Sequence, residues 1–565
     1  MKKTLLLLVV LLVSVMLLVS ACGKPVESET ADPASSGETP APVADGERPL
    51  RIGVSGDALA DPAMGSYNSC LQSYINLYDS LVMYNVEGEL VPLLASSWEP
   101  SEDGLTYTLK LNEGWTFHDG SEVLASDVVF SLNRLLTIGA GLSFVFEGFV
   151  DSAEALDDYT VAFHLPAPDA VFIDRLSRLY IVNEDLIMAN LSMDNPTYSY
   201  GEFGDYGISY LVANDAGSGP YALTEFVAGN YMRADMYEDY ALGWGENAPT
   251  YIKFINNCEP STVRTMLANK ELEISDNWQN AETYAAWSSM DGISITQYSS
   301  GATVMVPFNC FRAPTDDVNV RRAIACLIDY ASLVESIYPG SQVSYGPVNT
   351  AVPGADASVT ELAYNYDLER AKAYLAASKY ADQLDSVVVE FFCGADSASQ
   401  EKIGLTVQAA ASQIGLNVKV TTAPYSTLLE LVGSAETTPN IIVNSLCPLY
   451  WDASDMFVAH YAAAQGTIMN TCWIEDSAFV DQVYASLKIA DPVDRYAAYA
   501  EISSYITDQC FSMFAGDLVE KVAYQSDYVY WPTAAEYFDK DGTVNVNELG
   551  YQYWAHDFEI YADKM

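Results

Sequence analysis

The segment that most constrains the fold runs from Gly104 to Arg134 and reads GLTYTLKLNEGWTFHDGSEVLASDVVFSLNR. Its first part alternates between apolar and polar residues, which predicts a half-buried strand over Gly104 to Gly114. Phe117 to Gly120 has the composition of a turn. The residues after Asp127 place their apolar side chains at helical spacing. Strand, turn and helix therefore follow one another within one short segment.

The same mixture recurs along the chain. Strand patterns occur at Pro49 to Gly56, Glu154 to Leu165 and Pro220 to Phe226, and a helix-like stretch covers Ser69 to Asn85. Strands that alternate with helices favour an α/β fold over an all-α or all-β one. The chain has 565 residues, and about 515 remain after its N-terminal leader and linker, which is more than one core usually covers. We therefore expect two large lobes.

The N-terminus has the features of an export signal. Lys2 and Lys3 precede an apolar run from Leu5 to Leu18, which is short for a membrane span and typical of a signal peptide. Val19-Ser20-Ala21-Cys22 resembles the bacterial lipobox, in which the cysteine is lipidated after cleavage. We expect a signal peptide over 1–21 and a lipid on Cys22; the alternative is an ordinary cleaved signal with a chance cysteine.

A linker follows the cysteine. Residues 22–48 are rich in Pro, Ser, Thr, Glu, Ala and Gly, so they cannot bury enough apolar surface to fold and are expected to form a disordered tether. The formal net charge of the chain is −50, which repels nucleic acid and anionic headgroups. We therefore expect no nucleic-acid partner, and attachment to the extracytoplasmic face of the cell membrane through lipid and not through charge.

The Gly104 to Arg134 segment resembles a signature of the solute-binding proteins of the oligopeptide, dipeptide and nickel ABC transporter family. The matching residues are Gly114, Phe117, Asp119, Gly120, Ala125, Asp127, Val128, Ser131 and Arg134. Two later landmarks of that family follow in order. One is GSGPY at Gly217 to Tyr221, and the other contains Asn309, Pro314, Asp317, Val320, Arg321, Ala323 and Asp329.

The resemblance implies a two-lobed periplasmic-binding-protein-like fold with two hinge strands. We expect the N-terminal lobe at 49–296 plus 512–565, with an extra subdomain at roughly 85–210, and the second lobe at 297–511. The first crossing is expected near Ile293 to Gly301 and the return near Cys510 to Ala515. The same resemblance makes the His118 segment a turn and a helix cap: Asp119 and Asp127 accept backbone N–H groups, and His118 packs or hydrogen-bonds locally.

The segment is also a candidate active site, because His118, Asp119 and Asp127 could share protons. A catalytic His–Asp pair needs a nucleophile, and the sequence has no Gly-x-Ser-x-Gly motif. We therefore do not expect an enzyme, and no cofactor is implied. His118, His164, His460 and His556 have no metal-ligand spacing, and Asp539 to Leu549 reads better as a hairpin turn than as a calcium loop, so no metal site is expected.

A fourth landmark bears on the ligand. Leu449 to Phe457 falls where the family has Trp-x-x-Asp-Tyr-x-Asp-Pro, and Asp452 and Asp455 keep the aspartate spacing. In the family's peptide binders the first aspartate holds the α-ammonium group, which implies Asp452 here, with Asp455 close behind. The alternative is that Asp452 only caps a helix that begins at Ala453.

The remaining candidates line the expected cleft. Tyr450 and Trp451 are candidates for a flat wall against ligand side chains, or are simply core residues. Tyr67 and Asn68 follow the first strand, where the family's N-terminal lobe lines the cleft.

The function implied is peptide capture and delivery to an ABC permease and its ATPase subunits by a monomeric lipoprotein. The same scaffold could instead bind an oligosaccharide or another small solute, or sense peptides at the cell surface.

Overall fold

A computed structural model of the chain describes residues 46–256, 260–277, 279–395, 397–536, 544–545 and 551–565, which belong to one compact unit. The predicted signal peptide, Cys22 and most of the predicted tether lie outside these residues, as does most of the Asp539 to Leu549 segment. Within the described part, no helix combines the length and the apolar character that crossing a membrane requires.

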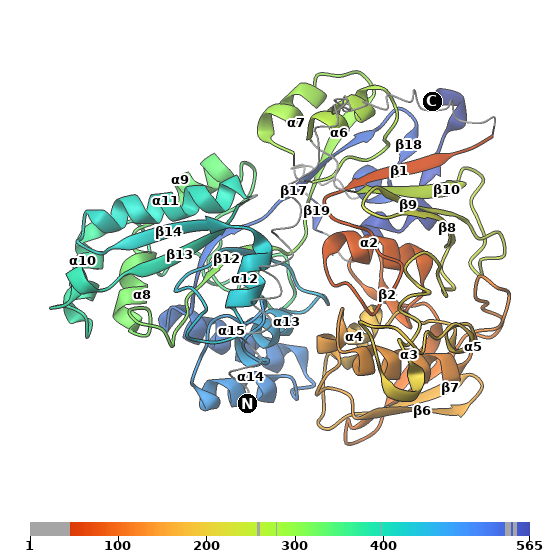
Figure 1. Cartoon of the computed structure of the whole chain (residues 1–565), viewed down its shortest axis with the longest axis horizontal. Coiled ribbons are helices and arrows are strands. Elements are labelled where there is room, and N and C mark those ends of the chain that lie inside the picture. Colours follow the sequence, from red (N-terminus) through yellow and green to blue (C-terminus); the bar gives the residue numbers. More distant parts are fainter. Residues whose placement is uncertain (1–45, 257–259, 278, 396, 537–543, 546–550) are drawn as a thin grey trace, which may run out of the picture. The chain divides into compact units, whose positions relative to one another are not determined.

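The first lobe is built on a four-stranded mixed sheet in the order β1-β10-β9-β8 (Figure 1). β1 pairs in parallel with β10, and the other pairs are antiparallel. The strands are β1 (Pro49–Val54), β8 (Tyr221–Val227), β9 (Tyr231–Met236) and β10 (Tyr251–Asn256). The strands predicted near Pro49 and Pro220 are therefore confirmed. Two helices of this lobe, α6 (Pro260–Ala268) and α7 (Ala281–Trp287), precede the first crossing strand.

A second antiparallel sheet forms within residues 95–164, in the order β4-β5-β7-β6. Its strands are β4 (Ala95–Pro100), β5 (Thr106–Leu111), β6 (Ser152–Asp157) and β7 (Thr160–His164), and α3 (Ala125–Ile138) packs on β6 and β7. The predicted strand at Gly104 to Gly114 is confirmed as β5. The single strand predicted over Glu154 to Leu165 is wrong: its Asp157-Asp158-Tyr159 turn folds the segment into the β6–β7 hairpin.

The helix-like stretch from Ser69 to Asn85 is only partly helical. α2 covers Asn68–Leu77, the backbone of Tyr78 is extended, and β2 (Val82–Tyr84) then pairs with β3 (Leu90–Pro92). The GSGPY loop ends the helix, because Gly219 N donates to Leu77 O at 3.1 Å. A Cβ on Gly217 would lie 1.9 Å from Leu77 O, so only glycine permits this approach. Apolar periodicity within α2 and β2 cannot reveal that a distant loop separates them.

Two pairs of strands join the first lobe to the second. β11 (Ile293–Ser299) pairs with β17 (Glu520–Gln525), and β12 (Thr303–Pro307) pairs with β16 (Ser512–Asp517) and β15 (Asn444–Leu446). The chain changes sheet between β11 and β12 and again between β16 and β17. From these pairings we propose that the lobe boundaries run through residues 300–302 and 518–519, with β16 in the second lobe.

The second lobe contains the parallel pair β13 (Val389–Gly394) and β14 (Val418–Ala423), with α11 (Ala398–Ser412) packed against both strands. Its other helices are α8 (Val318–Ala325), α9 (Tyr330–Ile337), α10 (Leu368–Ala377), α12 (Tyr425–Leu431), α13 (Ala453–Phe457), α14 (Ser477–Ser486) and α15 (Pro492–Asp508). The short strands β18 (Val529–Tyr530) and β20 (Glu559–Ile560), together with α16 (Pro532–Glu536) and β19 (Val544–Asn545), follow the return.

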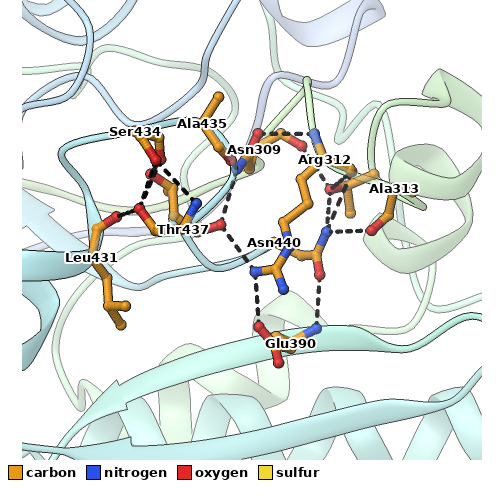
Figure 2. A network of polar contacts seen from close by, with 11 residues as sticks. Asn309, Arg312, Ala313, Glu390, Leu431, Ser434, Ala435, Thr437 and Asn440 are labelled. Carbon is orange, nitrogen blue, oxygen red and sulfur yellow. Dashed lines mark hydrogen bonds and ion pairs between the residues drawn. The ribbon is translucent and has the colours of Figure 1, made fainter. Parts of the chain in front are cut away.

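The buried asparagines Asn309 and Asn440 fix the loops of the second lobe. Asn309 Nδ2 donates to the carbonyl oxygens of Ala435 and Thr438 at 2.8 and 3.0 Å. Asn440 Nδ2 donates to Ala313 O at 3.0 Å, and its Oδ1 accepts from Glu390 N at the same distance (Figure 2). These bonds satisfy backbone groups that the loops would otherwise leave unpaired in the interior.

Candidate functional site

The His118 segment has a structural role. Asp119 Oδ1 accepts from Ser121 N at 2.9 Å, and Asp127 Oδ2 accepts from Leu124 N at 2.9 Å in the first turn of α3. Both predicted bonds are therefore confirmed. His118 does not bond locally: Nδ1 lies 2.7 Å from Asp215 Oδ1 and Nε2 lies 2.9 Å from Gly219 O. The histidine thus ties the signature segment to the GSGPY loop that ends α2.

The structure places Asp452 immediately before α13. Its Oδ1 accepts from Ser454 N at 2.9 Å and from Ser454 Oγ at 2.6 Å, so the predicted helix-capping role is confirmed. The carboxylate is buried, and its other oxygen lies 3.9 Å from Arg495 Nη2. Burial raises the pKa of Asp452, and the bonds from Ser454 and the charge of Arg495 partly offset that rise. One oxygen therefore caps the helix, the other lies near Arg495, and the Tyr499 hydroxyl also favours the ionised carboxylate.

Asp455 is also buried and closes a loop. Its Oδ2 accepts from Leu449 N at 2.7 Å, which folds the segment between β15 and α13 back on itself. Burial raises the pKa of Asp455 to about 6, although the Leu449 N–H bond, Arg175 and Arg178 favour the ionised form. The predicted pair Asp452 and Asp455 thus lies together in one buried turn.

The turn Leu449 to Asp455 contacts the first lobe directly. Trp451 N donates to Tyr84 Oη at 2.9 Å, and Tyr84 Oη donates to Asp174 Oδ1 at 2.8 Å. Arg178 Nε donates to Leu449 O. Because Tyr84, Asp174 and Arg178 belong to the first lobe, this turn is one place where polar groups of the two lobes meet; Ala170 N, which donates to Leu487 O at 2.8 Å, is another.

Arg175 strengthens the same contact. Its guanidinium carbon lies 4.7 Å from the ring centroid of Tyr450 and 3.6 Å from that of Phe149. Arg175 Nε is also 2.7 Å from Asp169 Oδ2, so the cation is paired within its own lobe while it stacks across the interface. Cation–π contacts of desolvated groups contribute about 2 kcal/mol.

Tyr450 and Trp451 are both buried, as the core interpretation predicts. The Trp451 ring packs between two backbone turns, one at Gly301 and the other at Gly88. A Cβ on Gly301, between β11 and β12, would lie 2.7 Å from Trp451 Cζ3, and one on Gly88, between β2 and β3, would lie 3.5 Å from Nε1. The indole therefore packs between the crossing strands and the first lobe.

Tyr67 and Asn68 lie elsewhere on the first lobe, at the start of α2. Tyr67 is 48% exposed, and its ring lies against Gly56. Burial raises the pKa of its hydroxyl, and an interaction with Cys70 adds to that rise. They remain candidates because of their position after β1, separate from the turn that carries Asp452.

Sequence reasoning missed the first-lobe residues of this interface, namely Tyr84, Asp174, Arg175 and Arg178. A signal was present in Val171 to Val182, VFIDRLSRLYIV, where three charged residues interrupt an apolar run. Charged side chains are rarely buried unless they are paired. Burial raises the pKa of Asp174 to about 6, and repulsion from Asp452 contributes to that rise.

Within the described residues, no group of three or more His, Cys, Asp or Glu side chains has the arrangement of a metal site. His460, which follows the turn, is buried, and its Nδ1 lies 2.9 Å from Met469 O. Burial lowers the pKa of His460 to about 4, so its ring is neutral at physiological pH.

Comparison with known proteins gives consistent matches. A probable D,D-dipeptide-binding periplasmic protein of Escherichia coli, DdpA, is 27% identical over 472 residues, or 81% of this chain and 86% of that protein. Heme-binding protein A of Haemophilus influenzae is 23% identical over 402 residues, or 66% of this chain and 69% of its own.

The fold is also found in solved structures. The periplasmic binding protein DppA of Helicobacter pylori, in complex with the peptide STSA, superposes with a TM-score of 0.75 at 21% identity, over 91% of this chain and 98% of that one. The profile described as "Bacterial extracellular solute-binding proteins, family 5 Middle" matches residues 89–467. This chain therefore belongs to family 5 of the bacterial extracellular solute-binding proteins, with their two-lobed α/β fold.

Proposed function

We propose that this protein captures peptides between its lobes and delivers them to an ABC transporter permease. The observation that carries the proposal is the turn Leu449 to Asp455, which brings two buried carboxylates of the second lobe against Tyr84, Asp174 and Arg178 of the first. A ligand that binds at this turn would contact both lobes and would therefore favour the closed arrangement.

Asp452 is the proposed partner of the peptide α-ammonium group. Its capping bonds use Oδ1, whereas Oδ2 lies 3.9 Å from Arg495 Nη2, and the Tyr499 hydroxyl also interacts with the carboxylate. A cation that leaves water needs a paired, hydrogen-bonded anion, and a buried carboxylate meets that need. Asp174 lies close enough to repel Asp452, so an ammonium group would relieve a like-charge contact between the lobes. In this proposal Asp455 supports the turn, Tyr450 and Trp451 form the wall, and Tyr67 and Asn68 are contacts on the first lobe.

Two relatives support a peptide as the ligand. The Escherichia coli relative is named for D,D-dipeptide binding, and the Helicobacter pylori structure is a complex with the peptide STSA. A third relative is named for binding heme, so the family's ligands are varied. This chain has 39 tyrosines and 9 tryptophans, which would also serve to stack sugars. The alternative is therefore an oligosaccharide or another small solute on the same scaffold, or a lipoprotein that senses peptides at the surface.

The cellular setting follows from the N-terminus. We infer a monomer held on the extracytoplasmic face of the cell membrane by lipid on Cys22, with residues 22–48 as a tether that lets it reach the permease. The protein itself performs no covalent chemistry in this account. The ATPase subunits of the transporter would supply the energy for transport.

The substitution Asp452→Asn tests the ammonium site. Asparagine caps helices as well as aspartate does, so α13 keeps its cap while the negative charge is lost. We expect binding of peptides with a free N-terminus to weaken by about 2–5 kcal/mol in isothermal titration calorimetry, with little change in the thermal midpoint of the ligand-free protein.

The matched control is Asp476→Asn, since Asp476 caps α14 in the same way, through Phe479 N, and is more exposed. This variant should bind peptides as the unmodified protein does. Unchanged peptide affinity in Asp452→Asn would rule out the ammonium role, and a large loss of ligand-free stability would show that the negative charge of Asp452 stabilises the fold itself.

A further inference from the structure

A cavity of about 440 Å³ lies in the second lobe, and none of its lining residues belongs to the turn Leu449 to Asp455. Its wall comes from α8, α10, the C-terminal end of α15 and the chain between Tyr345 and Tyr364. All of its lining residues in the described structure fall within 322–374 and 503–508, and the turn touches only the back of this wall, where Ala453 N donates to Pro353 O at 2.9 Å. Its volume falls in the range of about 300–1,000 Å³ that is usual for small-molecule sites.

Arg370 gives the cavity a cation whose partners are neutral. Its Nη1 donates to Ala363 O at 3.0 Å and its Nη2 donates to Tyr374 Oη at 3.1 Å. None of the ion pairs formed by the described residues includes Arg370 (all of them are made by other cations). A guanidinium group has five N–H donors, so Arg370 retains donors for a planar anion.

The second arginine of the wall is already paired. Arg322 Nη2 lies 3.0 Å from Asp508 Oδ1, and its Nε donates to Asp508 O at 3.1 Å. The Arg322 guanidinium is therefore occupied by Asp508 at the C-terminal end of α15 and contributes little to the binding of a ligand. The cation available to a small molecule is Arg370, on the opposite helix α10.

The remaining wall combines flat apolar surface with a carboxylate. Tyr364 and Tyr374 each have their ring centroids 5.5 Å from the Arg370 guanidinium carbon, and Tyr345 and Val359 add apolar surface. Asp356 also lines the cavity. The cavity thus offers a cation, an anion and aromatic faces within one small volume.

We propose that this cavity is a second binding site, for a free amino acid with an aromatic or large apolar side chain. The ligand's carboxylate would bind Arg370, its ammonium group would face Asp356, and its side chain would lie on the tyrosine rings. A zwitterion carries no net charge, so it escapes the repulsion that a chain of net charge −50 exerts on polyanions such as nucleotides. This site is additional to the interlobe peptide site and does not depend on it.

The test is calorimetric titration of the full chain with L-phenylalanine, in parallel with 3-phenylpropanoate and phenethylamine, which each lack one charged group. We expect saturable binding of L-phenylalanine that weakens at least tenfold in Arg370→Gln. Lys372→Gln is the matched control, because Lys372 lies on the same exposed helix and does not line the cavity. Binding in Lys372→Gln and in Asp452→Asn should be unchanged.

A second variant does not depend on charge. Val359→Trp places a large side chain into the cavity from a residue that is 39% exposed, so the fold tolerates it and the ligand should be excluded. The proposal is overturned if L-phenylalanine shows no saturable binding, if phenethylamine binds as well as L-phenylalanine does, or if Arg370→Gln and Val359→Trp bind it normally. Loss of binding in Asp452→Asn alone would assign the amino acid to the interlobe turn and would also overturn the proposal.

Discussion

Replacing Tyr84 by phenylalanine removes the one hydroxyl that links Trp451 of the second lobe to Asp174 of the first among the described contacts. In the closed arrangement Trp451 N would lose its acceptor and Asp174 Oδ1 would lose its donor; Trp451 is buried there and Asp174 is partly buried. When the lobes separate, water can satisfy both groups. The cost therefore falls on the closed form, which is the form that holds the ligand.

The size of the effect follows from the bond between the lobes. A buried polar group left without a partner costs about 1–3 kcal/mol. Trp451 N loses its acceptor only in the closed form, whereas Asp174 is partly exposed, so water can replace its lost donor in both forms. We therefore expect the Kd for a peptide to rise between about fivefold and about 150-fold, at 1.4 kcal/mol for each factor of ten.

Tyr74→Phe is the matched control. The Tyr74 hydroxyl donates to Asp61 O at 2.7 Å, entirely within the first lobe, and its ring is fully buried. We expect this variant to lower the thermal midpoint and to leave the peptide Kd unchanged, whereas Tyr84→Phe should raise the Kd. Equal Kd values for Tyr84→Phe and the unmodified protein, in calorimetric titration with the same peptide, would refute the closing role of the Tyr84 hydroxyl.

Three further predictions concern other parts of the chain. Burial raises the pKa of Asp174 and Asp455 from 3.8 to about 6, so each carboxyl binds a proton more readily in the folded state, and this stabilisation is lost as the pH rises through about 4 to 6. Denaturant titrations should therefore show an unfolding free energy about 1 kcal/mol per group higher at pH 5 than at pH 7. The Asp174→Asn, Asp455→Asn double variant should lose that part of the pH dependence. Gly219→Ala places a Cβ 2.6 Å from Leu77 C and should lower the free energy of unfolding by about 3 kcal/mol or more. Gly245→Ala, whose Cβ would have no atom within 4 Å, should leave the free energy of unfolding nearly unchanged. Equal thermal midpoints for the two variants would show that the close approach of Gly219 to Leu77 does not end α2. Cys22→Ser should move the protein from the membrane fraction to the soluble fraction, and retention in the membrane would argue against a lipid anchor on that residue.

Local patterns predicted the elements whose signals lie within one segment. β5 follows from strict alternation, and α3 follows from helical spacing after a turn that contains Asp-Gly. The end of α2 and the β6–β7 hairpin were not predicted. α2 ends because Gly219, far along the chain, bonds to Leu77, and a continuous apolar run carries no trace of such a contact.

In the candidate site too, the features with a local sequence signal could be predicted and the contacts between distant segments could not. The capping role of Asp452 could be predicted, because an aspartate before a short helix is a local signal. Its contact with the first lobe could not, since Tyr84 and Arg178 meet the turn only after both lobes have folded. The charged residues of Val171 to Val182 were visible in the sequence, but their partners were not.

Peptide capture between the lobes is the central claim, and a selection experiment tests it most directly. The full chain is incubated with a mixture of short peptides and with the same mixture acetylated at the N-termini, and the retained molecules are identified by native mass spectrometry. We predict that peptides with free N-termini are retained and that Asp452→Asn retains far fewer. Retention of the acetylated mixture to the same extent would contradict the ammonium site, and retention of no peptide from either mixture would contradict peptide capture itself.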